Sequence, residues 1–142
     1  MKFYLEHANL SVDDAQDTVN FLLAAIPDWK VRGTGKWDAP TGQTVSWFHV
    51  GDDENYITVQ SGGDGPAKEW SSQWTGVKHL GIVVPALTPL IERLRKQGYE
   101  VDHFGGEHPH RQSAYYVEGN NVQFEFVEYL STVANERNDY TI

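Results

Sequence analysis

Two short segments of the chain, His7 to Val12 and His79 to Val84, follow the same pattern. In "LEHANLSVD", which begins at Leu5, and in "VKHLGIVVP", which begins at Val77, a histidine stands third and an alternating run that ends in valine follows it. Around each copy the residues predict the same order of elements: a strand, a helix and three further strands. An internal repeat of this kind is typical of two equivalent structural units. It predicts an α+β fold that is built twice from one pattern.

The first copy is expected to occupy residues 1–61. A strand over residues 2–12 is followed by Asp13 and Asp14, which favour the first position of a helix. Apolar residues then recur at helical spacing until Pro27 ends the helix. Runs of alternating residues bounded by turn-forming residues predict three more strands, at 29–35, 44–50 and 56–60.

The second copy is expected to occupy residues 77–130. A strand precedes a helix that Gly98 ends, and three strands follow. The expected bounds are 77–84 for the first strand, 89–97 for the helix, and 99–104, 113–117 and 122–129 for the last strands. A Gly- and Ser-rich connector covers about 62–76 and a polar tail about 131–142. The sequence thus predicts a single domain over 1–142 that contains both copies.

Charge and composition exclude several classes of protein. The 142 residues carry a formal net charge of -9, whereas a nucleic acid or an anionic membrane requires a basic patch on its partner. The chain has no cysteine, so disulfides, thiolate nucleophiles and cysteine zinc sites are excluded. It shows neither a signal-peptide pattern nor the run of about 18 apolar residues that a membrane helix needs. A cytoplasmic protein is therefore expected.

Four side chains with nitrogen or oxygen donors are the candidate metal ligands. Successive residues of a strand point to opposite faces, so His7 and His79 face away from the apolar residues of their strands. Glu125 stands between Phe124 and Phe126, and an unpaired buried carboxylate requires a cation, a proton or a metal. Gln60 is expected to hold in the first copy the place of Glu125. Donors of this kind suit one divalent ion of Ni, Mn, Fe, Co or Zn.

Alternatives remain for several of these positions. Gln123 lies two residues before Glu125 on the same face and is the rival ligand. A histidine on a strand is also often a hydrogen-bonded structural residue. Arg111 either fixes an anionic substrate through its fork of donors or lies at the surface, and Tyr115 either lines a pocket or belongs to the core. The remaining histidines, which have no assigned role, are His49, His103, His108 and His110.

The segments "LEHANLSV", "YITVQ", "VKHLGIVV" and "YYVEGNNVQFEFVEY" resemble the vicinal oxygen chelate superfamily over nearly the whole chain. That superfamily includes glyoxalase I, bleomycin-resistance proteins and extradiol dioxygenases. The resemblance implies paired βαβββ modules whose curved mixed sheets surround a shared cavity. It also implies metal ligands on the first and last strands of each module, which fall on His7, Gln60, His79 and Glu125.

Two features depart from the better-known members. The turn before the last strand reads "VEGNN" where many members have Asp-Pro-Asp-Gly-Asn, and the first strand has no arginine of the kind that grips glutathione. Asn9 occupies that neighbourhood instead. The expected substrate-binding residues are therefore Asn9, Arg111 and Tyr115, and the use of glutathione is left open.

The resemblance implies a metal-dependent lyase or isomerase of the glyoxalase kind. It would chelate two vicinal oxygens of a small carbonyl substrate and stabilise an enediolate-like intermediate, with Glu125 as general base. The first alternative is a metal-free binding protein of the bleomycin-resistance kind, whose cationic planar ligand would suit the acidic, aromatic-rich chain. The second is an Fe(II) extradiol dioxygenase. A homodimer is expected by analogy with the superfamily.

Overall fold

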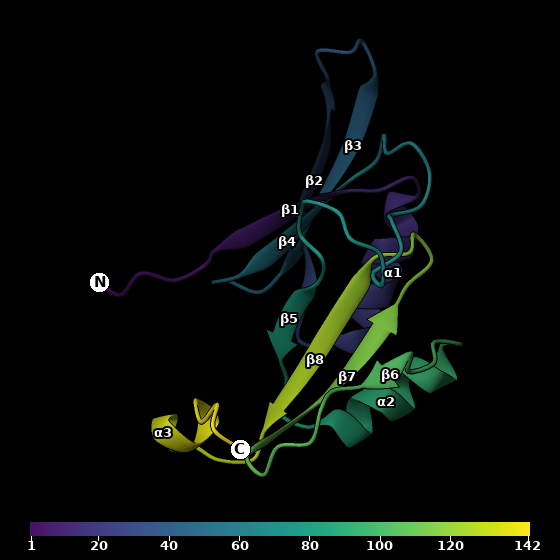
Figure 1. The fold of residues 1–142 in the computed structure, drawn as a ribbon. Coiled ribbons are helices and arrows are strands. Elements are labelled where there is room, and N and C mark those ends of the chain that lie inside the picture. Colours follow the sequence, from purple (N-terminus) through teal and green to yellow (C-terminus); the bar gives the residue numbers. More distant parts are fainter. The chain divides into compact units, whose positions relative to one another are not determined.

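The computed structural model describes residues 1–142 and divides into two compact units. The first unit consists of Met1–Ala67 together with Gly119–Asn121, and the second of Lys68–Glu118 together with Val122–Ile142. Each unit contains a four-stranded mixed sheet whose first strand is followed by a helix, and the second unit also contains a short C-terminal helix, α3 (Figure 1). The predicted order of strand, helix and three strands, written twice, is confirmed.

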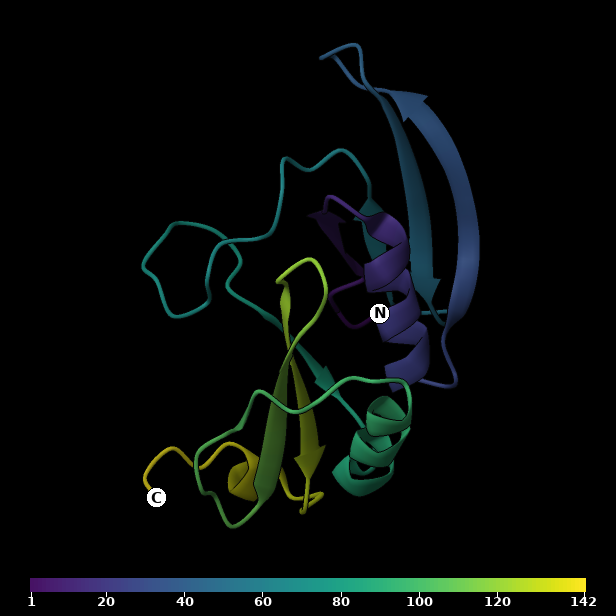
Figure 2. The ribbon, with the colours of Figure 1, turned by 90° about the vertical axis from the view of Figure 1, so that its right-hand side faces the viewer.

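The sheet of the first unit has the strand order β1-β4-β3-β2. Its β1 strand pairs in parallel with β4, and the other two pairings are antiparallel. Figure 2 shows β2 and β3 as a long curved hairpin. The bounds of the elements are β1 (His7–Ser11), α1 (Ala15–Ala25), β2 (Lys30–Asp38), β3 (Thr44–Gly51) and β4 (Tyr56–Gln60).

Helix α1 begins where the sequence predicts. The Asp14 side chain accepts hydrogen bonds from the backbone amides of Gln16 and Asp17, as a helix N-cap does. The helix packs against β3 and β4 through a buried face that includes Phe21 and Leu22. Burial of this apolar face stabilises the first unit, since a helix of this length gains most of its stability from packing.

The buried side chain of Asn120 fastens the start of α1 within the first unit. Its Oδ1 accepts from the backbone amide of Asp14 at 2.9 Å, and its Nδ2 donates to the Asp14 carbonyl at 2.6 Å and to Thr18 Oγ1 at 2.9 Å. Only 4% of Asn120 is exposed. All the main hydrogen-bonding groups of this amide are therefore satisfied inside the protein.

The sheet of the second unit has the strand order β5-β8-β7-β6, with β5 and β8 parallel. Helix α2 covers one face of this sheet (Figure 2) and contacts β8. Leu90 and Leu94 of α2 are fully buried, as are Tyr116, Phe124 and Phe126 of the sheet. The bounds are β5 (Leu80–Val83), α2 (Leu87–Lys96), β6 (His103–Phe104), β7 (Arg111–Val117), β8 (Gln123–Tyr129) and α3 (Ala134–Arg137).

The ends of several strands differ from the prediction. Strand β1 starts at His7, and the alternating residues before it are exposed, with Phe3 99% exposed. Strand β6 contains only His103 and Phe104, since only these residues pair with β7. Alternation alone therefore overestimates a strand where no neighbouring strand supplies hydrogen bonds. None of the helices has the length and apolar character that crossing a membrane requires.

Candidate active site

A row of functional side chains crosses the sheet of the second unit. The strand register sets His103 of β6 beside Tyr115 of β7, Tyr115 beside Glu125 of β8, and Glu125 beside Gly81 of β5. Residues that are paired in this way share one face of a sheet. Phe124 and Phe126 point to the opposite face and are fully buried. The row therefore lies on the face that α2 does not cover, which we call the helix-free face.

His79, which immediately precedes β5, meets the Glu125 end of this row. His79 Nε2 lies 3.2 Å from Glu125 Oε2, and the side chains are 34% and 20% exposed. Gly81 faces Glu125 in the adjacent strand and has no side chain to cover the carboxylate. The structure thus brings together the two candidate ligands that the second copy supplies, on a part of the sheet that solvent reaches.

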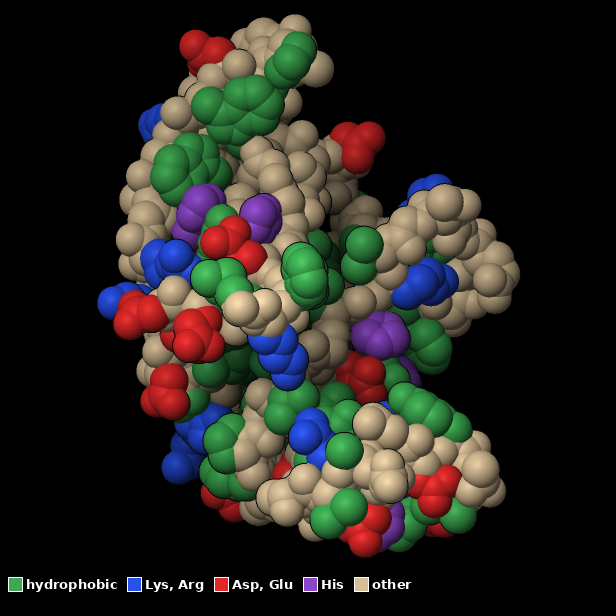
Figure 3. Space-filling view, turned by 90° about the vertical axis from the view of Figure 1, so that its left-hand side faces the viewer, with side chains coloured by type: hydrophobic (Ala, Val, Ile, Leu, Met, Phe, Trp, Pro, Cys, Tyr) green, Lys and Arg blue, Asp and Glu red, His purple; other side chains and the backbone are tan.

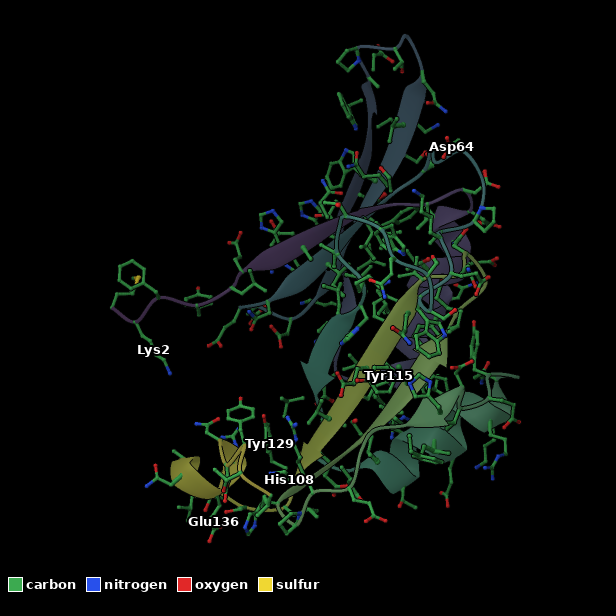
Figure 4. The ribbon with its side chains drawn as sticks, in the orientation of Figure 1. Lys2, Asp64, His108, Tyr115, Tyr129 and Glu136 are labelled. Atoms are coloured by element: carbon green, nitrogen blue, oxygen red, sulfur yellow. The ribbon has the colours of Figure 1, made fainter.

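Tyr115 holds the carboxylate of Glu125 in place. Its phenol hydrogen-bonds to Glu125, and burial together with the Glu125 charge raises the pKa of Tyr115 above its ordinary value of 10.0. The phenol therefore stays protonated at neutral pH and donates to the carboxylate. The His79 ring meets the Tyr115 ring edge-on, with centroids 5.3 Å apart. Figure 4 shows Tyr115 over the sheet of β5, β8 and β7. Of the two predicted alternatives, a pocket residue or a core residue, Tyr115 takes the position beside the candidate ligands.

His103 extends the row beyond Tyr115. Its ring lies parallel to the Tyr115 ring at 4.3 Å between centroids and also stacks on Trp70 at 4.8 Å. Its Nδ1 lies 2.6 Å from Asp102 Oδ2. Sequence reasoning found no partner for His103. The "DHF" segment contains the acidic neighbour, but the contact with Tyr115 depends on how β6 pairs with β7.

His7 belongs to a different aromatic row, on the sheet of the first unit. Its ring stacks on Tyr56 at 4.9 Å, Tyr56 stacks on His49 at 4.5 Å, and His49 contacts Trp47 at 4.8 Å. Burial, and next the charges of Arg32 and His7, lower the pKa of His49. His7 itself is 45% exposed in its side chain and pairs with Glu6 at 2.9 Å. Histidine side chains lie at the surface among hydrophobic ones in Figure 3.

Gln60 does not hold the place that the repeat predicts. Ala8 and Leu80 each follow the histidine of their copy, and they pair with Ile57 and Phe124 respectively. The next residue along each last strand is therefore equivalent, so Thr58 is the counterpart of Glu125. His7 and Gln60 pair with residues four positions apart, which separates them by about 13 Å along the strands. The first unit therefore does not bring these two residues together. The prediction equated Gln60 with Glu125, whereas the correspondence follows the pairing register.

The Gln60 amide forms contacts of its own. Its Nε2 donates to Asn9 Oδ1 at 2.8 Å, and its Oε1 accepts from the Trp37 indole at 3.0 Å. The structure thus joins Gln60 to Asn9, which is one of the predicted substrate-binding residues. Gln123, the rival of Glu125, is 4% exposed and pairs with Val117, farther from the row.

Arg111 lines a separate cavity of about 540 Å³ in the second unit. The cavity lies between the start of α2 and the segment after β6, and its apolar lining includes Leu87, Ile91 and Phe104. Arg111 pairs with Tyr129 in the strand register, four residues along β7 from Tyr115. The structure therefore places Arg111 outside the row that contains Tyr115.

The two histidines of the "EHPHRQ" loop contact the C-terminal tail. The His108 ring lies 2.9 Å from the Asp139 carbonyl oxygen, and His110 lies 3.7 Å from Glu136. Figure 4 shows His108, Tyr129 and Glu136 near α3. These contacts explain the two histidines as groups that fasten the tail, in agreement with the interpretation of the segment as a polar loop.

The donor set of the second unit fits a divalent ion. A separation of 3.2 Å between His79 Nε2 and Glu125 Oε2 is close to the distance of about 3 Å between adjacent ligands whose bonds are about 2.1 Å long. No group of three or more His, Cys, Asp or Glu side chains gathers in the structure. Imidazole nitrogen and carboxylate oxygen suit Mn, Fe, Co, Ni and Zn alike, so the pair does not select one metal.

Comparison with solved structures identifies the fold. A glyoxalase family protein from Bacillus cereus matches with a TM-score of 0.72 at 12% identity, over 92% of this chain and 97% of that chain. A glyoxylase/bleomycin resistance protein/dioxygenase domain from Frankia sp. EAN1pec matches with a TM-score of 0.70 at 21% identity, over 91% and 99%. The expected fold of the vicinal oxygen chelate superfamily is therefore confirmed.

A third similar structure contains a metal. It is a variant of the genomically encoded fosfomycin resistance protein FosX from Listeria monocytogenes, complexed with Mn(II) and 1S,2S-dihydroxypropylphosphonic acid. The TM-score is 0.65 at 18% identity, over 94% of this chain and 96% of that chain. No protein-family model matches the sequence, and no curated protein does. At these identities the likeness establishes the fold and leaves the activity to be inferred from the site.

Proposed function

We propose that this protein, which has the fold of the vicinal oxygen chelate superfamily, is a metal-dependent enzyme acting on a small substrate with two neighbouring oxygens. The observation that carries the proposal is the His79–Glu125 pair at 3.2 Å on the helix-free face. A carboxylate and an imidazole that meet on a solvent-reached face, with Gly81 leaving the carboxylate uncovered, suit a site that admits a ligand. The expected reaction is a lyase or isomerase reaction on a small carbonyl compound.

In this proposal His79 and Glu125 hold a divalent ion, and His7 and Gln60 remain candidate ligands on the resemblance alone. When bound, the ion would supply Lewis acidity to two vicinal oxygens of the substrate. Tyr115 fixes Glu125 by donating to its carboxylate, which keeps the ligand oriented. Glu125 also serves as the general base, and Asn9 and Arg111 are retained as candidate contacts to the substrate.

The FosX variant suggests which metal to test first. Its Mn(II) and its bound dihydroxypropylphosphonic acid show that this fold accommodates a divalent ion with a small molecule carrying two adjacent hydroxyl groups. Mn(II) is therefore the first probe for this protein, followed by Ni, Zn, Fe and Co. We further expect a cytoplasmic homodimer.

The test is direct measurement of metal binding. Protein purified without a histidine tag is titrated with Mn(II) by isothermal calorimetry, and its metal content is determined by elemental mass spectrometry. We expect one ion per chain in the wild type and a loss of affinity of roughly 100-fold or more in His79→Ala and Glu125→Gln, since each removes a ligand. His110→Ala, which removes a half-buried histidine paired with Glu136, is the matched control and should bind normally.

The opposite result favours a metal-free binding protein. If the wild type binds none of the five metals, the aromatic row of His7, Tyr56, His49 and Trp47 becomes the better candidate site. The guanidinium of Arg32 already lies over the Tyr56 ring at 4.4 Å, which is the kind of contact that a planar cationic ligand makes. Equal Mn(II) affinity in the wild type and in Glu125→Gln would likewise remove the basis of the enzyme proposal.

A further inference from the structure

One histidine of the row, His103, is not part of the proposed ligand set. His103 Nδ1 lies 2.6 Å from Asp102 Oδ2, so the carboxylate accepts the Nδ1 proton and Nε2 is left without a hydrogen-bond partner. The His103 side chain is 36% exposed and the Asp102 side chain is 38% exposed. A histidine whose Nδ1–H is held by a carboxylate presents an unprotonated Nε2, which is the form that accepts a proton.

The rings around His103 restrict how it can turn. The Tyr115 ring is nearly parallel to it, at an angle of 6°, and the Trp70 ring lies against it at 25°. Together with Asp102, these contacts define both the plane and the rotation of the imidazole. A side chain held by packing and by a hydrogen bond is pre-organised, which is what proton transfer in an active site requires.

The position of His103 suits a small molecule held at His79 and Glu125. Strands β6 and β8 are two strand spacings apart, or about 10 Å, and the Tyr115 ring lies between them on the same face. The Tyr115 centroid is 5.3 Å from that of His79 and 4.3 Å from that of His103. Hydrogen bonds of about 2.9 Å at each end take up rather more than half of this distance, which leaves room for two or three carbon atoms.

We infer that His103, oriented by Asp102, is a proton-transfer residue of this site, and that the substrate is a small α-hydroxycarbonyl compound held over Tyr115. The inference rests on the proposed function and adds to it a second proton-carrying group besides Glu125. Isomerisation of an α-hydroxycarbonyl compound moves one proton between the two carbon atoms and another between the two oxygen atoms. Two proton-carrying side chains can therefore each move one of these protons.

The step balances without any co-reactant. His103 Nε2 takes the proton from the carbon that carries the hydroxyl group. The electron pair of the broken C–H bond forms a carbon–carbon double bond, and the carbonyl electron pair moves to its oxygen. The imidazolium of His103 remains next to the Asp102 carboxylate and returns the proton to the former carbonyl carbon. Glu125 carries the hydroxyl proton to the former carbonyl oxygen, so that the new carbonyl forms on the first carbon.

The other histidines offer no equivalent. His108 and His110 contact the tail. His49 stands between the Tyr56 and Trp47 rings, and the acid beside His7 is the exposed Glu6. Of the six histidines, His103 alone combines a carboxylate on Nδ1, rings that restrict it, and a place in the row of Glu125.

The first test uses the metal-free protein. At alkaline pH, long-range ¹H–¹⁵N NMR of the imidazoles is expected to show the proton of the His103 ring on Nδ1. In Asp102→Asn the proton should move to Nε2, because the amide can donate to Nδ1. A His103 ring with its proton on Nε2 in the wild type would overturn the inference, since that nitrogen could not accept a proton.

The second test measures proton transfer on hydroxyacetone, a three-carbon α-hydroxyketone. The Mn(II)-loaded protein is incubated with it in D₂O, and deuterium incorporation at carbon is followed by mass spectrometry. We expect His103→Gln to lower the first-order exchange rate at saturating hydroxyacetone by about 100-fold or more with unchanged Mn(II) affinity. Asp102→Asn should lower the same rate less, without weakening hydroxyacetone binding, and His110→Gln should leave it unchanged.

The outcomes separate the two proposals. Failure of the wild type to bind Mn(II) refutes the proposed function and this inference with it. Normal Mn(II) binding without exchange, or with equal exchange in the wild type and His103→Gln, refutes only the inference. Loss of exchange in His103→Gln with intact Mn(II) binding supports both.

Discussion

The amide of Asn120 offers a quantitative test of how the first unit is held together. Asn120→Ala removes three hydrogen bonds, one from the Asp14 amide, one to the Asp14 carbonyl and one to Thr18. Each is worth about 1 kcal/mol in net stability, and the groups left behind are partly or fully buried. We therefore expect the free energy of unfolding to fall by about 3 kcal/mol.

The assay is urea denaturation followed by circular dichroism, with thermal unfolding as a second measure. For a chain of this size, about 3 kcal/mol corresponds to a fall of about 10 °C in the melting temperature. Asn20→Ala is the matched control, because Asn20 lies in α1, is exposed, and bonds only to Gln16. Alanine favours a helix more than asparagine does, so the control should be neutral or slightly stabilised.

A loss below about 1 kcal/mol in Asn120→Ala would refute the reasoning, since single hydrogen bonds already reach that size. It would mean that the Asp14 amide and carbonyl find other partners when the side chain is removed. The start of α1 would then depend on the Asp14 N-cap alone.

Three further predictions concern packing and pH. Gly35→Ala should destabilise the protein by about 1–3 kcal/mol and alter tryptophan fluorescence, because an added Cβ would lie 2.7 Å from the Trp47 ring. At Gly33 the nearest atom to an added Cβ is 3.9 Å away, so the control Gly33→Ala should cost less. Burial raises the pKa of Tyr116 to about 12 from 10.0, so the stability it contributes is full below pH 10 and is lost as pH rises to about 12; alkaline unfolding curves of Tyr116→Phe should be flatter over this range. The lowered pKa of His49 means that stability is full above pH 6.5 and falls as pH drops below it, and urea titrations at several pH values should show a shallower fall in His49→Gln; an unchanged slope would contradict this.

Much of the fold follows from local patterns in the sequence. The first residue of α1 is predicted by Asp14, and β4 is predicted at Tyr56–Gln60, as observed. The alternation in β8 separates Phe124 and Phe126 from Glu125 correctly, because a two-residue period determines which face a side chain occupies. These features depend on neighbours in the chain, so the sequence alone is sufficient.

The arrangement of the site depends on pairing between distant strands, which local patterns do not contain. The pairing of His103 with Tyr115 joins two strands through a loop, and nothing in the "VDHFGG" segment indicates that only two residues of it pair. The same holds for Gln60: once β1 and β4 are in register, the residue equivalent to Glu125 is Thr58, two positions before Gln60. The His79–Glu125 contact could be predicted because His79 borders a strongly patterned strand and Glu125 lies in another.

The make-up of the first unit has a consequence for the order in which the chain is synthesised. Its residues are not contiguous, since Gly119–Asn121 belong to it although they follow β7. On the ribosome, α1 and its sheet emerge long before Asn120 is made, and domains fold as their residues become available. The first half therefore lacks the hydrogen bonds from Asn120 to the start of α1 until most of the second half has been translated. A separately expressed fragment that ends at Ala67 would lack these hydrogen bonds permanently.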